Sequence, residues 1–189
     1  MIQLKLIAAA CEDLGIGLNN NLPWRLKTEM AYFTRMTETT KNANKKNVVI
    51  MGRRTWDSIP PKFKPLSNRI NFVLSRSPLA ISEFKDSYSF LSLESAVDAL
   101  KSSQFAGKFD SVWVIGGSQI YKLAMENKYF YRMYLTRIMK SFECDTFLPA
   151  LPENLSEVQD PEVPVEVQSE NGIEFVYKIY ENPNSVAQV

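Results

Sequence analysis

Four short runs of apolar residues constrain the fold of this chain more than any other feature. They lie at residues 4–10, 47–51, 69–75 and 111–115. A strand that is apolar on both faces has to be covered on both faces, as the central strands of parallel sheets are. Helical patterns alternate with these runs, and helices are expected at residues 26–36, 53–58, 93–103 and 118–126. The alternation predicts an α/β fold with a mostly parallel sheet.

The last third of the chain has a different pattern. Strands are expected there at residues 131–139, 144–148 and 174–180, with no helix between them. This pattern predicts antiparallel strands added to a parallel core. The tail after Asn182 is expected to be irregular. No repeat, linker or second domain is expected within residues 1–189.

The composition excludes whole classes of function. The chain has 22 Lys and Arg against 21 Asp and Glu, so no basic field is expected to attract nucleic acid. It contains no histidine, which excludes Ser-His-Asp and Cys-His catalysis and His-ligated metal sites. The two cysteines, Cys11 and Cys144, are far apart in the sequence, and we expect two free thiols and no metal. Acid–base chemistry must then come from carboxylates, Tyr, Lys or water.

The hydropathy pattern bears on the setting of the protein. The chain has no run of about 18 apolar residues and no charged segment before an apolar one at its start. We therefore expect no membrane partner and a cytoplasmic protein. A chain of 189 residues fits one domain. No strand or helix shows a spare apolar face, so a monomer is expected.

One carboxylate, Glu29, lies in an apolar helical pattern. If residues 26–36 are helical, then Leu26, Met30 and Phe33 recur at the spacing of a core-facing stripe. Glu29 belongs to that stripe or to its edge. An ionised carboxylate among apolar side chains is destabilising unless something pairs with it. No Lys or Arg on the stripe offers that pairing, whereas a ligand with hydrogen-bond donors would.

Three expected strands end in residues that suit an anion. These strand ends, at residues 52–55, 75–76 and 116–118, combine glycines, hydroxyls and guanidinium groups. Ligands of open α/β sheets bind at the carboxyl ends of strands, where helix N-termini and glycines admit phosphates. Each feature alone is more often a solvated pair or an ordinary turn. Together they indicate a dinucleotide, although no GxGxxG motif follows the first strand, and the arginines favour one with a 2′-phosphate.

Two further features are open to more than one interpretation. Gly15, Ile16 and Gly17 form either a mobile loop near a ligand or an ordinary turn. Trp24, after Pro23, is either a core side chain or part of a site.

The chain resembles the dihydrofolate reductases from about Leu4 to Tyr180. The motifs that carry the resemblance are Gly15 to Gly17, Leu22 to Trp24, Glu29 with Phe33, residues 49–56, Ile59 and Pro60, Pro65 and Leu66, residues 69–71, residues 74–76, residues 114–118, Tyr121 and Thr136. The length and residues 59–69 resemble the eukaryotic, monofunctional form. The resemblance implies one domain over residues 1–189, with a mixed, mostly parallel central sheet of about eight strands. Flanking helices and a C-terminal antiparallel hairpin complete the implied fold.

The resemblance also implies a reaction, the NADPH-dependent reduction of 7,8-dihydrofolate to 5,6,7,8-tetrahydrofolate. A hydride goes to C6 of the pterin, and a proton reaches N5 through water. By similarity Glu29 binds the pterin and Thr136 supports its carboxylate, while the water that carries the proton passes either Trp24 or the side of Met30 and Phe33. Arg69 is implied to bind the α-carboxylate of the glutamyl tail. Desolvation is expected to raise the pKa of Glu29. The implied pocket, which also binds antifolates, consists of Ile7, Ala9, Glu29, Met30, Phe33, Ile59, Leu66, Arg69, Ile115, Tyr121 and Thr136.

For the cofactor NADPH, the resemblance implies contacts along the three strand ends. The implied residues are Ala9, Ile16, Gly17, Gly52, Arg53, Arg54, Thr55, Leu74, Ser75, Arg76, Ile115, Gly116, Gly117, Ser118, Gln119, Ile120 and Tyr121. The family carries a cis peptide at the position of Gly116 and Gly117. Glu94 departs from relatives that have a basic residue near the adenosine phosphate, which weakens the expected preference for the 2′-phosphate.

Two other functions remain in view. A pyrimidine reductase of riboflavin synthesis shares the fold and NADPH, but the acidic residue on the first helix and Arg69 argue against it. A catalytically dead relative that binds folate or RNA requires the loss of Glu29, Trp24 or the phosphate-binding strand ends, and none is lost.

Overall fold

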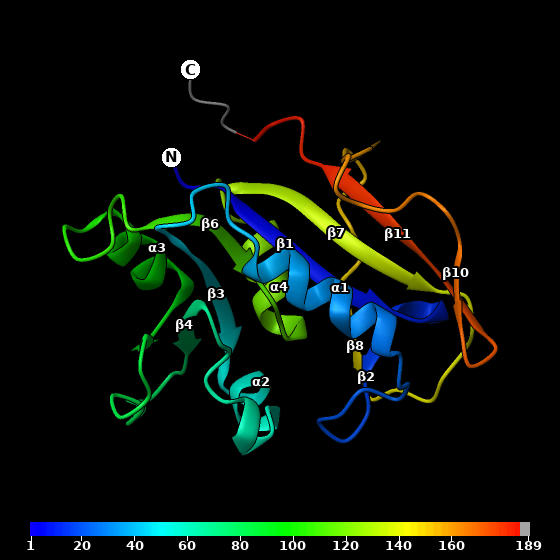
Figure 1. Ribbon diagram of the computed structural model, residues 1–189, viewed down its shortest axis with the longest axis horizontal. Helices are drawn as coiled ribbons and strands as arrows, with labels where there is room; N and C mark the ends of the chain where they lie inside the picture. The colour runs from blue at the N-terminus through cyan, green and yellow to red at the C-terminus, as the bar shows by residue number, and fades with distance from the viewer. Residues whose placement is uncertain (186–189) are drawn as a thin grey trace.

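A nine-stranded sheet forms the centre of the computed structural model, which describes residues 1–185 (Figure 1). The strands are β1 (Leu4–Ala10), β2 (Gly15–Gly17), β3 (Lys46–Gly52), β4 (Arg69–Leu74), β5 (Ser87–Phe90), β6 (Phe109–Val114), β7 (Phe130–Ile138), β8 (Thr146–Phe147), β9 (Ser156–Val158), β10 (Gln168–Glu170) and β11 (Ile173–Glu181). The helices are α1 (Lys27–Glu38), α2 (Arg53–Ser58), α3 (Leu93–Lys101) and α4 (Ser118–Met125), with short 3-10 turns η1 (Glu12–Leu14) and η2 (Pro61–Phe63). Strands β2 and β8 form a separate two-stranded sheet.

The strand order of the main sheet is β10-β11-β7-β1-β6-β3-β4-β5, and β9 pairs with β11. The pairs from β7 to β5 along this order are parallel, whereas β11 is antiparallel to β7, β9 and β10. The expected parallel core and C-terminal hairpin are therefore confirmed. The prediction that the last third adds only antiparallel strands is wrong for β7, because α4 supplies the crossover that a parallel pairing with β1 needs.

The continuous apolar runs follow from burial of both sheet faces. In β3, Val48 and Ile50 pack into a core cluster with residues of α3 and α4, whereas Val49 and Met51 pack into a second cluster with residues of α1 and α2. Successive side chains of a strand point to opposite faces, so both clusters are filled from the same strand. Figure 1 shows α1 lying across the near face of the sheet. No helix in residues 1–185 is long and apolar enough to cross a membrane.

The helix boundaries differ slightly from those predicted. Helix α1 starts after Leu26 and runs to Glu38, and α3 ends at Lys101. The side chains of Ser92 and Ser95 form a capping box that fixes the start of α3. Residues 183–185 lie in a turn and bend, and the rest of the predicted irregular tail, residues 186–189, lies outside the described residues.

Candidate functional site

The three predicted anion-binding strand ends lie side by side at one edge of the sheet. Strands β6, β3 and β4 are consecutive in the strand order, and all three run in the same direction. At the ends of β3 and β6, the Gly52 N–H donates to the Gly116 carbonyl at 2.8 Å, and the Ile115 N–H donates to the Ile50 carbonyl at 2.9 Å. These bonds bring together the ends of β3 and β6, although Gly52 and Gly116 lie 64 positions apart (116 − 52) in the sequence.

Two helices begin at this edge with open N-termini. Helix α2 starts at Arg53 and α4 at Ser118, and the preceding residues, Gly52 and Gly117, provide no side-chain cap. Backbone N–H groups of a helix N-terminus attract anions. The exposed guanidinium groups of Arg53, Arg54 and Arg76 flank the same edge.

The turn between β6 and α4 depends on glycine. The Gly116–Gly117 peptide bond is cis, as expected, and Gly116 has φ +114°. A Cβ on Gly116 would lie 3.1 Å from the Tyr121 ring. Tyr121 is buried, and its hydroxyl donates to the Ile7 carbonyl at 2.7 Å, so it is a fixed wall of the site rather than a free acid.

Glu29 is the buried carboxylate that the sequence singled out. It lies in the first turn of α1 with 5% of its surface exposed, and the Thr136 hydroxyl donates to its Oε1 at 3.0 Å. Burial raises the pKa of Glu29 to about 7, and the bond from Thr136 opposes that rise. Among residues 1–185 no Lys or Arg forms an ion pair with Glu29. The carboxylate is thus free to receive a ligand's donors.

The predicted stripe around Glu29 is wrong for Met30. Met30 is 47% exposed and Phe33 is half-buried, whereas the buried residues of α1 are Glu29, Tyr32, Met36 and Thr37. Tyr32 stacks on Tyr177 of β11, with ring centroids 3.9 Å apart, so the face of α1 that carries Tyr32 packs against the sheet. Met30 and Phe33 are consequently accessible to a ligand beside Glu29.

Trp24 is a core side chain, which is one of its two predicted interpretations. Its ring is buried and packs edge-on against Phe142, with centroids 5.6 Å apart. Its Nε1 is buried without a hydrogen-bond partner among the described residues. A buried N–H of this kind calls for a water or a ligand acceptor.

Arg69 is a buried cation at the start of β4. It is 5% exposed, its Nη1 donates to the Thr37 hydroxyl at 2.9 Å, and its Nε donates to the Ser67 carbonyl at 2.9 Å. Burial lowers the pKa of Arg69, while the nearby Glu38 raises it. The guanidinium has five N–H donors, so donors remain for a carboxylate. Thr37 is not among the residues predicted from the sequence, because its only signal is its place on the same helix as Glu29.

The other predicted substrate residues come from neighbouring elements. Ala9 of β1 is paired with Thr136 of β7 in the sheet register. Ile59 follows α2, Leu66 precedes β4, and Ile115 follows β6; all three are half-buried. Of the cofactor residues, Leu74 and Ser75 are buried, Ile16, Gly17, Thr55, Ser118 and Ile120 are half-buried, and Gln119 is exposed.

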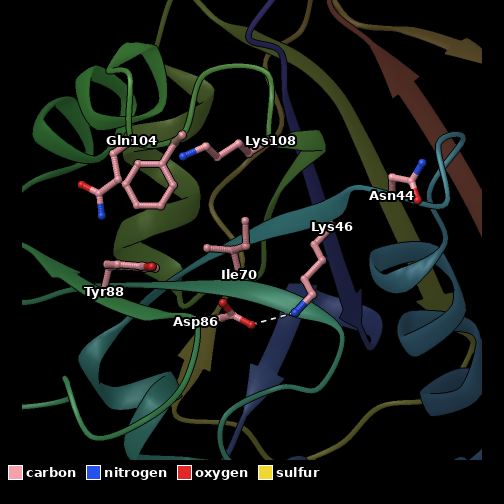
Figure 2. A pocket seen from close by; sticks show the side chains of 8 residues that line it. Asn44, Lys46, Ile70, Asp86, Tyr88, Gln104 and Lys108 are labelled. Atoms are coloured by element: carbon pink, nitrogen blue, oxygen red, sulfur yellow. Dashed lines mark hydrogen bonds and ion pairs between the residues drawn. The ribbon is translucent and has the colours of Figure 1, made fainter.

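Figure 2 shows a hollow at the opposite edge of the sheet, where the parallel strands begin. It has a volume of about 350 Å³ and includes Lys46, Ile70, Asp86 and Tyr88 in its lining. Lys46 Nζ lies 2.7 Å from Asp86 Oδ2, so the two charges neutralise each other. None of the predicted site residues lines this hollow.

The comparisons with known proteins agree on one family. A family model described as dihydrofolate reductase matches residues 3–182. The dihydrofolate reductase of Heliothis virescens is 44% identical over 182 residues, covering 95% of this chain and 97% of the relative. That of Sus scrofa is 44% identical over 188 residues, covering 96% of this chain and 98% of the relative. The solved structure of Schistosoma mansoni dihydrofolate reductase superposes with a TM-score of 0.85 at 36% identity, covering 96% of this chain and 99% of the other.

Proposed function

Because the chain belongs to the dihydrofolate reductase family, and so is an oxidoreductase that reduces dihydrofolate to tetrahydrofolate, we propose how its own residues carry out that reaction. The relatives do not favour the alternative of a pyrimidine reductase. The family binds dihydrofolate and antifolates and uses a nicotinamide cofactor. We propose that residues 1–189 form a single domain with this activity.

The observation that carries the proposal is the buried carboxylate of Glu29, which has a hydroxyl partner but, within residues 1–185, no cation partner. A pterin presents two adjacent donors, the 2-amino group and the N3–H, and these match the two oxygens of a carboxylate. With a pKa of about 7, Glu29 is partly ionised near neutral pH, and two donors stabilise the ionised form. Glu29 thereby orients the pterin, and Thr136 fixes the carboxylate.

We propose that water carries the proton to N5. The 2-amino group and N3 lie across the pterin from N5, so a carboxylate that binds them is not in contact with N5. The unpaired Nε1 of Trp24 can hold a water at the site. Tyr121 does not compete as an acid, because its hydroxyl donates to Ile7.

Arg69 is proposed to bind the α-carboxylate of the glutamyl tail. The guanidinium is held at a fixed place by Thr37 and Ser67, which leaves its remaining donors oriented for a carboxylate. Met30, Phe33, Ile59 and Leu66 are proposed to cover the ring that joins pterin and tail.

The cofactor is proposed to be NADPH. When bound, the nicotinamide supplies the hydride that reaches C6. The glycine turn at Gly116 and the open N-termini of α2 and α4 suit phosphates, and exposed arginines suit a 2′-phosphate. Ala9, Ile16 and Tyr121 are proposed to border the nicotinamide.

The choice of cofactor is tested with Arg76→Ala. We expect a rise in KM for NADPH of roughly tenfold and little change for NADH, because only NADPH carries the 2′-phosphate. Arg137→Ala, at an exposed arginine of β7, is the matched control. An equal loss for both cofactors contradicts the assignment of Arg76.

We propose further that the protein acts as a monomer in the cytoplasm. Its two cysteines are free thiols, which suits a reducing compartment. Among the exposed large apolar side chains, Met30 is a proposed substrate contact, which a ligand can cover.

The proposal is tested by following the absorbance of reduced nicotinamide with and without dihydrofolate. The wild type should oxidise NADPH only when dihydrofolate is present. Glu29→Gln should lose roughly 10²- to 10⁴-fold in kcat/KM, whereas the control Glu153→Gln, at an exposed carboxylate between β8 and β9, should match the wild type. No dihydrofolate-dependent turnover contradicts the activity, and full activity of Glu29→Gln contradicts the role of Glu29.

A further inference from the structure

Two thiols that the proposed mechanism does not use lie next to each other. The Sγ atoms of Cys11 and Cys144 are 3.8 Å apart, although 133 positions separate the residues in the sequence. Cys11 is buried directly after β1, and Cys144 is half-buried before β8. Both are free thiols.

The backbone around the pair holds both cysteines in place. The Cys11 N–H donates to the Gly15 carbonyl at 2.9 Å, and the Asp145 N–H donates to the Gly17 carbonyl at 2.9 Å. Strands β2 and β8 pair in the same region, close to each other in Figure 1. The approach of the two sulfurs is thus fixed by the fold rather than by two flexible loops.

Gly15 leaves the space that the sulfurs occupy. A Cβ on this residue would overlap with the Cys144 Sγ and would lie 2.9 Å from the Cys11 Sγ. Any larger residue at position 15 would push the thiols away from their present positions. The absence of a side chain at Gly15 therefore permits the contact between the two thiols.

We propose that Cys11 and Cys144 form a reversible modification site, at which a low-molecular-weight disulfide such as oxidised glutathione converts the dithiol into an intramolecular disulfide. A disulfide requires the sulfurs to come within about 2.05 Å of each other. Rotation of the two side chains can supply this approach, because neither sulfur is held by a metal or an ion pair among the described residues.

Oxidation of the two cysteines needs only one molecule of the reagent disulfide. The thiolate of Cys144, the more accessible residue, attacks the reagent disulfide, forms a mixed disulfide and releases one small thiol. Cys11 then attacks the Cys144 sulfur and releases the second small thiol. Two protein thiols are oxidised, one reagent disulfide is reduced, and the two protein protons end on the released thiols.

The surroundings make the pair slow to react. Burial, the Cys11 thiol and the negative charge of Asp145 raise the pKa of Cys144, while a backbone contact at Gly17 lowers it. The thiolate is therefore scarce at neutral pH, and the reduced form persists until the reagent disulfide is abundant.

The disulfide would restrain residues 12–24, a segment that includes strand β2. Residues 12–24 follow Cys11 and carry Ile16, Gly17 and Trp24, and Trp24 packs on Phe142 two positions before Cys144. A covalent link from Cys11 to Cys144 ties the start of this segment to the residues that precede β8. We therefore expect a lower kcat in the oxidised protein. This effect on kcat rests on the proposed function, whereas the formation of the disulfide is independent of it.

The site is tested on the full chain incubated with oxidised glutathione, by intact mass and by thiol alkylation. The wild type should lose both free thiols and two hydrogens in mass, retain no glutathione, and recover both thiols with dithiothreitol. Cys11→Ser should instead retain one glutathione on Cys144, because it lacks the second thiol. Cys144→Ser should react far more slowly, since only the buried Cys11 remains.

Two outcomes overturn the modification site. One is a wild type that keeps a glutathione adduct, and the other is a wild type whose thiols stay free while the urea-unfolded chain reacts. In the activity assay, oxidation should lower the kcat of the wild type about threefold, reversibly, and leave Cys144→Ser unchanged. An unchanged kcat in a fully oxidised protein would contradict the proposed restraint on residues 12–24. The mass measurement tests the disulfide even if the protein does not reduce dihydrofolate.

Discussion

The hydroxyl of Thr136 on β7 donates to the buried carboxylate of Glu29 on α1 at 3.0 Å, across 107 positions of the sequence. Thr136 is fully buried, and it is paired with Ala9 in the sheet. The bond connects the helix that bears the acid with the centre of the sheet. It favours the ionised form of a carboxylate that burial otherwise keeps protonated.

Thr136→Val tests this bond with little change in shape. Because the bond lowers the pKa of Glu29, its loss should raise that pKa further and move the pH dependence of kcat/KM toward higher pH. The measurement is the pH profile of kcat/KM for dihydrofolate. An unshifted profile with a uniformly lower rate would show that Thr136 has only a structural role.

Glu29→Gln should stabilise the protein above neutral pH. The folded-state pKa of Glu29, about 7, lies above its value in the unfolded chain, about 4.5. The folded state therefore binds more protons between these values, and its stability falls as pH rises through this window. Glu29→Gln removes this pH-dependent loss of stability. At roughly 1.4 kcal/mol per pKa unit, the free energy of unfolding of the variant should exceed that of the wild type by about 3 kcal/mol at pH 8.

Urea unfolding of the wild type and Glu29→Gln at pH 4 and pH 8 measures this difference. The two proteins should be nearly equally stable at pH 4 and should differ at pH 8. A constant difference at both values would mean that Glu29 does not titrate in this window.

Arg69→Lys should weaken the binding of the glutamyl tail. A lysine cannot reproduce the bidentate contact, so we expect the Kd of dihydrofolate to rise roughly 10- to 100-fold. A pterin without the glutamyl tail should bind equally well to both proteins. If its affinity fell by the same factor, Arg69 would support the pocket rather than bind the tail.

Glu170 should control the first turn of helix α1. Its carboxylate accepts from the Thr28 N–H at 2.9 Å and from the Thr28 hydroxyl at 2.7 Å, and it also accepts from the Lys27 N–H. These bonds lower the pKa of Glu170, so the cap is fully present above the ordinary glutamate pKa and is lost only as pH falls through the lowered pKa of the folded protein.

Glu170→Ala should speed hydrogen exchange of the backbone amides at residues 27–30 and lower kcat/KM through Glu29, with an unchanged KM for the cofactor. The exposed Glu166, replaced by alanine, is the control. Unchanged exchange at these amides would contradict the capping role.

The sequence predicted the elements that are buried on both faces. Strands β1, β3 and β4 lie within one or two residues of the expected runs, because a strand covered on both faces leaves a continuous apolar signal. Strand β5 was missed because its four residues alternate polar and aromatic at the edge of the sheet, and β2, β9 and β10 have only three residues each.

The site was predictable where a residue contradicts its surroundings. Glu29 in an apolar pattern, and the glycines and arginines at strand ends, were visible without any structure. Contacts between distant segments were not, because nothing local marks them. These contacts include the Thr37–Arg69 bond, the cap of α1 by Glu170 and the approach of Cys11 to Cys144. The exposure of Met30 could not be predicted either, because the buried face of α1 is the one whose Tyr32 stacks on the distant Tyr177.

The central claim, that Glu29 is a buried carboxylate poised near neutral pH to bind the pterin, is tested most directly by carbon-13 NMR. Samples with labelled glutamate carboxyls, of the wild type and of Glu29→Gln, are titrated from acidic to alkaline pH. The wild type should show one carboxyl with a midpoint at about pH 7, and this signal should be absent in Glu29→Gln. Added dihydrofolate should convert the same signal to the ionised form. A wild type in which every glutamate titrates at ordinary values, or a Glu29 signal that dihydrofolate leaves unchanged, would contradict the account.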